Sequence, residues 1–130
     1  MEKHFMRSLV LDWAKNKNGS YMDYKTIDLK DKLFDGIGIY AIFCDKPPHR
    51  VFVKTGYGEL RKGLVVDDIV REYIAKYAPY VTFARIKNED DVRGALMYVN
   101  YKTMPRVKES FFPVEEMIEV NIPFLNHGDL

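Results

Sequence analysis

Three stretches of the chain have the apolar pattern of β-strands. Residues 37–44 form an almost continuous apolar run, too short for a helix and bounded by turn residues, which is typical of a central strand. Residues 50–55 follow after a turn containing Pro47 and Pro48, so both prolines stay outside the strand ladder. Residues 80–87 alternate between two faces. The pattern therefore predicts a hairpin and a third strand that pairs with it.

Two further stretches favour helices. The glycines of residues 56–58 should end the second strand in a loop, and apolar residues then recur at helical spacing. This first helix begins at Leu60 or at Asp67; the sequence leaves both starts open. Asn88, with an acidic residue three positions on, resembles a capping box and opens a second helix. The second helix should end by Met104, because a proline follows.

The two ends of the chain are less regular. Residues 1–14 fit either a short helix or a strand, and residues 21–29 suit an edge strand or an extended segment. Near the C-terminus, residues 113–119 allow one helical turn and residues 120–124 should be extended and dock the tail. We therefore expect one α+β domain over residues 1–130. Its small mixed or antiparallel three-stranded sheet has β-β-α-β-α order and helices on at least one face.

Charge and composition narrow the classes of function. Twenty basic and nineteen acidic residues give a net charge of +1, which argues against binding to nucleic acid by bulk charge but leaves room for a local basic face. The single cysteine, Cys44, excludes an internal disulfide and lies in an apolar strand, so we expect a buried, inert thiol. The three histidines are too scattered for a metal site.

The sequence also predicts a location. No apolar run approaches the roughly 20 residues that span a bilayer, and the N-terminus is a poor signal peptide, so we expect a cytoplasmic protein with no membrane partner. Glutamine is absent while lysine and glutamate are common, which is a thermophile-like composition.

The centre of the chain resembles the GIY-YIG nuclease superfamily. The resemblance lies in Gly38-Ile39-Tyr40, in the hairpin with Phe52-Val53 before a Lys-Thr-Gly stretch, and in the helix start at residues 60–64. It covers roughly residues 36–108. In this family two tyrosines and a helix arginine surround the scissile phosphate, and a glutamate on a later helix holds a divalent metal.

The resemblance matches few of these functional positions. Tyr40 stands at the first tyrosine, whereas Phe52 replaces the second and Gly63 replaces the arginine. Arg61 would substitute only if the start of the helix were rotated. The interval where the metal-binding glutamate belongs, residues 96–100, contains no carboxylate. The resemblance therefore implies the fold of a nuclease with most of its catalytic set missing, and Tyr40 is either a relic of the site or a core aromatic.

Three hypotheses follow from these residues. The first is a non-catalytic GIY-YIG-like domain, without a cofactor, that binds DNA, RNA or a protein partner through the former active-site face. Its expected nucleic-acid contacts are Arg50, Lys54, Tyr57, Arg61 and Lys62, with Lys46, Lys102, Arg106 and Lys108 as extensions of the same face; the alternative is an ordinary solvated surface.

The other two hypotheses belong to different classes. One is a divergent endonuclease that uses Tyr40, Arg61 and a carboxylate such as Glu59 with Mg²⁺ or Mn²⁺. The other is a homo-oligomeric scaffold that associates through exposed aromatic side chains.

Overall fold

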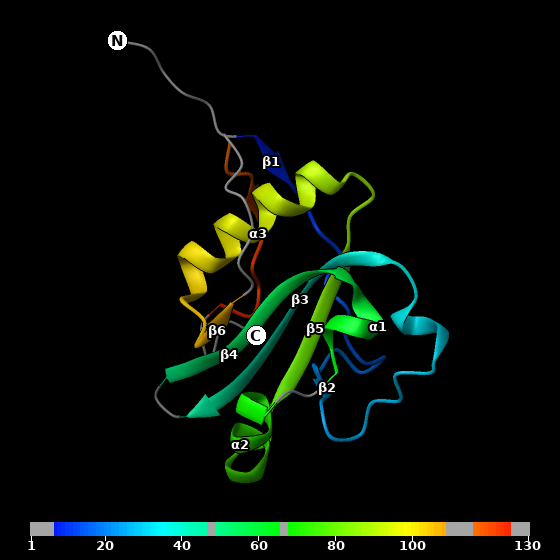
Figure 1. Cartoon of the computed structure of the whole chain (residues 1–130), viewed down its shortest axis with the longest axis vertical. Helices are drawn as coiled ribbons and strands as arrows, with labels where there is room; N and C mark the ends of the chain where they lie inside the picture. The colour runs from blue at the N-terminus through cyan, green and yellow to red at the C-terminus, as the bar shows by residue number, and fades with distance from the viewer. Residues whose placement is uncertain (1–6, 47–48, 66–67, 109–115, 126–130) are drawn as a thin grey trace.

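A five-stranded sheet forms the centre of the computed structural model, which describes residues 7–46, 49–65, 68–108 and 116–125 (Figure 1). Its strands lie in the order β2, β5, β3, β4, β6. Their bounds are β2 (Met22–Asp23), β3 (Ile37–Lys46), β4 (His49–Glu59), β5 (Tyr80–Arg85) and β6 (Val107–Lys108). The first four run antiparallel to their neighbours, and β6 pairs with β4 in parallel. A separate parallel pair joins β1 (Ser8–Leu9) to β7 (Glu119–Val120).

The helices lie between and after the long strands. A 3₁₀ turn, η1 (Lys32–Phe34), precedes β3, and β4 leads directly into α1 (Leu60–Gly63) and then α2 (Asp68–Lys76). The longest helix is α3 (Glu89–Thr103), after β5. The single expected helix is thus divided into two: Leu60, one predicted start, begins α1, and Asp67, the other, lies outside the described residues, next to the first residue given for α2.

The mixed α+β class is confirmed, but the prediction of three strands is wrong. The three long strands lie where the apolar runs are, and the short strands β2 and β6 extend the sheet at both edges. β2 lies within residues 21–29, which the sequence suited to an edge strand or an extended segment, whereas the two residues of β6 are too few to show a periodicity. From β3 onward the described chain runs β3, β4, α1, α2, β5, α3, β6, β7, so the expected β-β-α-β-α order is not confirmed.

The prediction that residues 56–58 form a loop is also wrong. They continue β4, where Tyr57 pairs with Ile39 and Gly58 with Gly38, and the ladder with β3 runs on to Glu59. Pro47 and Pro48, expected in the turn of the hairpin, lie outside the described residues. Residues 113–115 of the expected helical turn lie outside them as well. In the described part of the N-terminal segment, β1 precedes an irregular extended stretch and no helix forms.

Two apolar clusters cover the two faces of the sheet. One cluster packs β3 and β4 against α3 and the chain ends and includes Trp13, Phe43, Leu96 and Phe124. The other contains Tyr40, Val53, Leu60 and Leu64 with the side chains of β2 and η1. In Figure 1, β1 and α3 lie together, apart from α1. Among the described residues, no helix has both the length and the apolar character needed to cross a membrane.

Candidate functional site

Tyr40 lies in the core, enclosed between two glycines. It is only 1% exposed and belongs to the cluster with Leu60 and Leu64. A methyl group at Gly63 would come 2.8 Å from Tyr40 Cζ, and one at Gly56 would come 3.0 Å from its Cε1, with still closer atoms in both cases. These distances are below van der Waals contact, so the ring occupies the space that a side chain at either position would need.

The guanidinium of Arg61 fastens the segment before β3. It donates to the backbone oxygens of Leu29 (2.6 Å) and Asp31 (3.0 Å). It also forms an ion pair with Asp35. Arg85 binds the same segment, because its Nε donates to the carbonyl of Asp35 at 2.8 Å. Three hydrogen bonds of Arg61 are thus made to residues 29–35, which gives this side chain a structural role.

Arg50, predicted to contact nucleic acid, is buried instead. Its side chain is 1% exposed and makes a bidentate pair with Asp45, with Nε to Oδ1 at 2.7 Å and Nη2 to Oδ2 at 3.2 Å. Its Nη1 donates to the carbonyl of Phe124 at 3.1 Å, and its Cζ lies 4.6 Å from the centre of the Phe43 ring. Arg50 therefore joins the hairpin to the C-terminal tail and is not available to a ligand.

Lys54 and Tyr57 lie on opposite faces of the sheet. Between Ile42 and Phe43 the register with β4 shifts by one residue, so that Phe43 pairs with Phe52 and Ile42 with Lys54. Lys54 Nζ lies 6.0 Å from the centre of the Tyr40 ring, whereas Tyr57 packs against the cluster under α3. The predicted combination of a cation with a stacking ring is therefore not formed by these two residues.

Glu59 and Lys62 lie at the surface beside α1. Lys62 is 82% exposed and its Nζ lies 3.2 Å from Glu59 Oε2, an ion pair between side chains three residues apart. Exposed pairs of this kind contribute about 0–1 kcal/mol, so either group can exchange its partner for a ligand. Of the predicted contacts, Lys54 and Lys62 are cations that lie on the Tyr40 side of the sheet, Lys54 over the Tyr40 ring and Lys62 on the adjoining helix α1.

Residues 96–100, where the resemblance expects a metal-binding glutamate, pack on the other side of the sheet from Tyr40. Leu96 and Val99 of α3 belong to the cluster opposite Tyr40, and Asn100 hydrogen-bonds Thr55 through their side chains. Over the described residues, no three His, Cys, Asp or Glu side chains come together as a possible metal site.

The Cys44 thiol is buried in β3, as predicted. Burial is the main cause that raises its pKa from 9.0 to about 11, and the negative charge of Asp45 adds to the effect. The reactive thiolate is therefore scarce near neutral pH.

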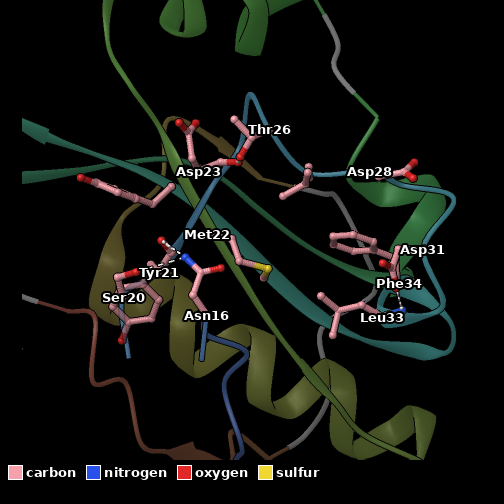
Figure 2. A pocket seen from close by; sticks show the side chains of 12 residues that line it. Asn16, Ser20, Tyr21, Met22, Asp23, Thr26, Asp28, Asp31, Leu33 and Phe34 are labelled. Carbon is pink, nitrogen blue, oxygen red and sulfur yellow. Dashed lines mark hydrogen bonds between the residues drawn. The ribbon is translucent and has the colours of Figure 1, made fainter. Parts of the chain in front are cut away.

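The structure also contains a hollow that the sequence patterns do not mark. It has a volume of about 500 Å³ and lies beside β2, between the loop at Asn16 and the segment that ends at Phe34 (Figure 2). Three aspartates line it, but Figure 2 shows them spread along the wall. Each accepts a hydrogen bond from a backbone N–H two residues on, at 2.8–3.0 Å. These carboxylates therefore stabilise turns.

A second surface was only partly anticipated. The end of α3 and the residues after it present Tyr98, Tyr101, Lys102, Met104 and Arg106, which we call the α3 surface. Lys102 was expected beside Lys54, but it belongs to α3, which packs on the opposite face of the sheet, whereas Arg106 directly precedes β6, the strand that pairs with β4 at Lys54. The feature of the sequence that indicates this surface is the absence of Asp and Glu from residues 92–108.

Comparison with known proteins adds no relative. No family model matches the chain, and neither a curated protein nor a solved structure is similar to it.

Proposed function

We propose that this protein is a non-catalytic, GIY-YIG-like domain that binds nucleic acid through the face around Tyr40. The observation that carries the non-catalytic part is the enclosure of the Tyr40 ring between Gly56 and Gly63. A phenol that assists hydrolysis must come within hydrogen-bond distance of the attacking water. A ring that is 1% exposed and surrounded by Leu60 and Leu64 offers a substrate phosphate no room there.

The other catalytic roles lack candidates as well. Cleavage by the family mechanism needs a cation on the phosphate and a carboxylate-bound metal near the same phenol. Arg61 is engaged by residues 29–35, and Glu59 is an exposed carboxylate paired with Lys62. The divergent endonuclease that would use Tyr40, Arg61 and Glu59 is therefore the weaker proposal.

The binding part rests on Lys54 and Lys62. Lys54 lies over the Tyr40 ring and Lys62 extends into solvent from α1, on the same face. Two lysines placed beside a former phosphate site are suited to contact the phosphates of a nucleic acid. Such contacts release counterions, so the binding affinity should fall as the salt concentration rises.

Two assays test this function. Supercoiled plasmid and branched DNA are incubated with the protein and Mg²⁺ or Mn²⁺, and we expect no cleavage. Binding is then titrated by gel shift at several salt concentrations for the wild type, for a Lys54→Gln/Lys62→Gln double variant and for a Lys76→Gln/Lys87→Gln control with the same change in charge. The double variant should bind more weakly, with a salt slope lower by about two, and the control should behave nearly as the wild type.

Each contrary result points elsewhere. Cleavage that is lost in Tyr40→Phe would overturn the non-catalytic proposal and favour the endonuclease. Absence of binding to any nucleic acid would overturn the binding part and favour a protein partner, or self-association if light scattering gives a mass above that of the monomer.

A further inference from the structure

The α3 surface exposes unusually large apolar side chains at the end of a helix. Tyr101 is 66% exposed and Met104 is 80% exposed, although both follow a buried helical stripe. Tyr101 points away from the core because it lies five residues after Leu96 and two after Val99, both fully buried. The exposed ring therefore presents an apolar face on which a flat ligand group could stack.

A cation is held between two rings of this surface. Lys102 Nζ lies 5.7 Å from the centre of the Tyr98 ring and 5.6 Å from that of Tyr101. Both distances are within the range of cation–π attraction. The ammonium group is thus positioned beside an exposed ring face, and Arg106 adds a second exposed cation shortly after the helix.

The fold brings together two segments without acidic residues. Residues 46–58 and 92–108 contain seven of the twenty Lys and Arg residues and none of the nineteen Asp and Glu. The pairing of β4 with β6 and the hydrogen bond between Thr55 and Asn100 join these segments in space. The rest of the chain has thirteen basic against nineteen acidic residues, so the net charge of +1 conceals a strong separation of charge. Arg50 is buried in its pair with Asp45, Arg93 is paired with Glu89 and Lys54 lies on the Tyr40 face, so on the α3 surface Lys102 and Arg106 are the cations that would attract a polyanion.

We propose that the α3 surface binds single-stranded nucleic acid. A base stacks on Tyr101, and Lys102 and Arg106 contact the flanking phosphates. Duplex DNA is the poorer ligand, because its base faces are stacked on one another and cannot reach an exposed tyrosine. This surface lies across the sheet from Tyr40, so the inference names a contact that the function proposed above does not use.

Fluorescence anisotropy tests the assignment. Labelled dT20, labelled rU20 and a labelled duplex of mixed sequence are titrated with the full-length protein at low and moderate salt. The variants are Tyr101→Ala, Tyr101→Phe and Lys102→Gln, with Lys87→Gln as a control for the loss of one exposed lysine. Thermal unfolding followed by circular dichroism verifies that each variant is folded. We expect the variants to fold, because the side chains of Tyr101 and Lys102 are exposed.

Stacking and charge give different expected results. Tyr101→Ala should weaken binding to both single strands about tenfold, whereas Tyr101→Phe keeps the ring and should bind nearly as the wild type. Lys102→Gln should lower the salt slope by about one, and Lys87→Gln should not. The two single strands differ only in sugar and base methyl, so a preference between them identifies the physiological form.

Three results would overturn the inference. They are equal affinity for duplex and single strand, unchanged binding by both Tyr101→Ala and Lys102→Gln, and preferential binding of a labelled polyglutamate. If binding is lost only in the Lys54→Gln/Lys62→Gln variant, the function proposed above stands and this inference fails. If only the α3 variants lose binding, the reverse holds. No binding to any strand would overturn both.

Discussion

Gly63 shows how the packing of one ring excludes a side chain at a neighbouring position. The resemblance to GIY-YIG nucleases places an arginine here, and in this structure the position borders the Tyr40 ring so closely that a single methyl group would collide with it. The backbone of Gly63 is not in the left-handed region, so the requirement for glycine is steric. Packing of the tyrosine and a side chain at residue 63 are therefore mutually exclusive.

We predict that Gly63→Ala destabilises the protein by about 1–3 kcal/mol, the usual cost of overpacking a core. The measurement is the midpoint of urea unfolding. Lys62→Ala, at an exposed position in the same short helix, serves as the control and should change stability little.

A double-mutant cycle identifies the cause. If the Tyr40 ring is the obstacle, adding Gly63→Ala in a Tyr40→Leu background should cost clearly less than in the wild type, with a coupling of about 1 kcal/mol. Equal costs in both backgrounds would show that Gly63 is needed for another reason.

At the scale of elements, the bounds of α3 are determined by a cap at each end. Asn88 Oδ1 accepts hydrogen bonds from the backbone N–H groups of Asp90 (2.9 Å) and Asp91 (3.4 Å), which confirms the predicted N-cap. At the other end, Met104 terminates the helix at φ 48°, and its N–H donates to the carbonyl of Asn100 at 2.9 Å. This left-handed cap is a position where glycine is usually found.

Replacing Met104 should therefore stabilise the helix. We expect Met104→Gly to raise the free energy of unfolding by about 0.5–1 kcal/mol, because glycine adopts a positive φ without a steric penalty. Met104→Ala, which keeps the penalty and removes the exposed side chain, is the matched control and should leave stability unchanged. Urea unfolding of the wild type, Met104→Gly and Met104→Ala measures the three free energies of unfolding. A glycine variant no more stable than the alanine variant would contradict the prediction.

At the scale of the whole molecule, the C-terminal tail completes the core. Phe124 is fully buried, stacks on Phe43 at 5.5 Å between ring centres and meets Trp13 edge-on at 4.7 Å. The N-terminal segment is held to the same tail, since Trp13 Nε1 donates to the carbonyl of Asn121 at 2.7 Å. Segments from both ends of the chain thus cover one face of the sheet.

We expect Phe124→Ala to cost about 3–5 kcal/mol, the range for removing a buried aromatic ring. Leu125→Ala, the neighbouring half-buried position, is the control and should cost less. Chemical unfolding monitored by Trp13 fluorescence measures both. A small effect of Phe124→Ala would mean that the tail is not part of the cooperative core.

Local patterns were enough to locate the long elements. The apolar runs of β3 and β4, the alternation of β5 and the Asn88 cap of α3 depend on residues close together in the chain, and each pattern marks its element, although β4 continues past the predicted end to Glu59. The burial of Cys44 and the docking of Phe124 follow from apolar character in the same way.

Long-range contacts decided the remainder. Arg50 is a surface cation by composition, and it is buried because Asp45 and the carbonyl of Phe124 satisfy its charge and its donors. The register shift in the hairpin places Lys54 beside Tyr40, and α3 on the far side separates Lys102 from it.

The sequence was sufficient for the α+β class and the positions of the long strands, because these depend on neighbouring side chains. The positions of the charges did not follow from it. Pairing between β4 and β6, which are about fifty residues apart, brings the acid-free segments together, and no local pattern encodes that contact. The tertiary structure therefore determined that Arg50 and Arg61 hold the fold together and that Lys102 lies on the face opposite Tyr40.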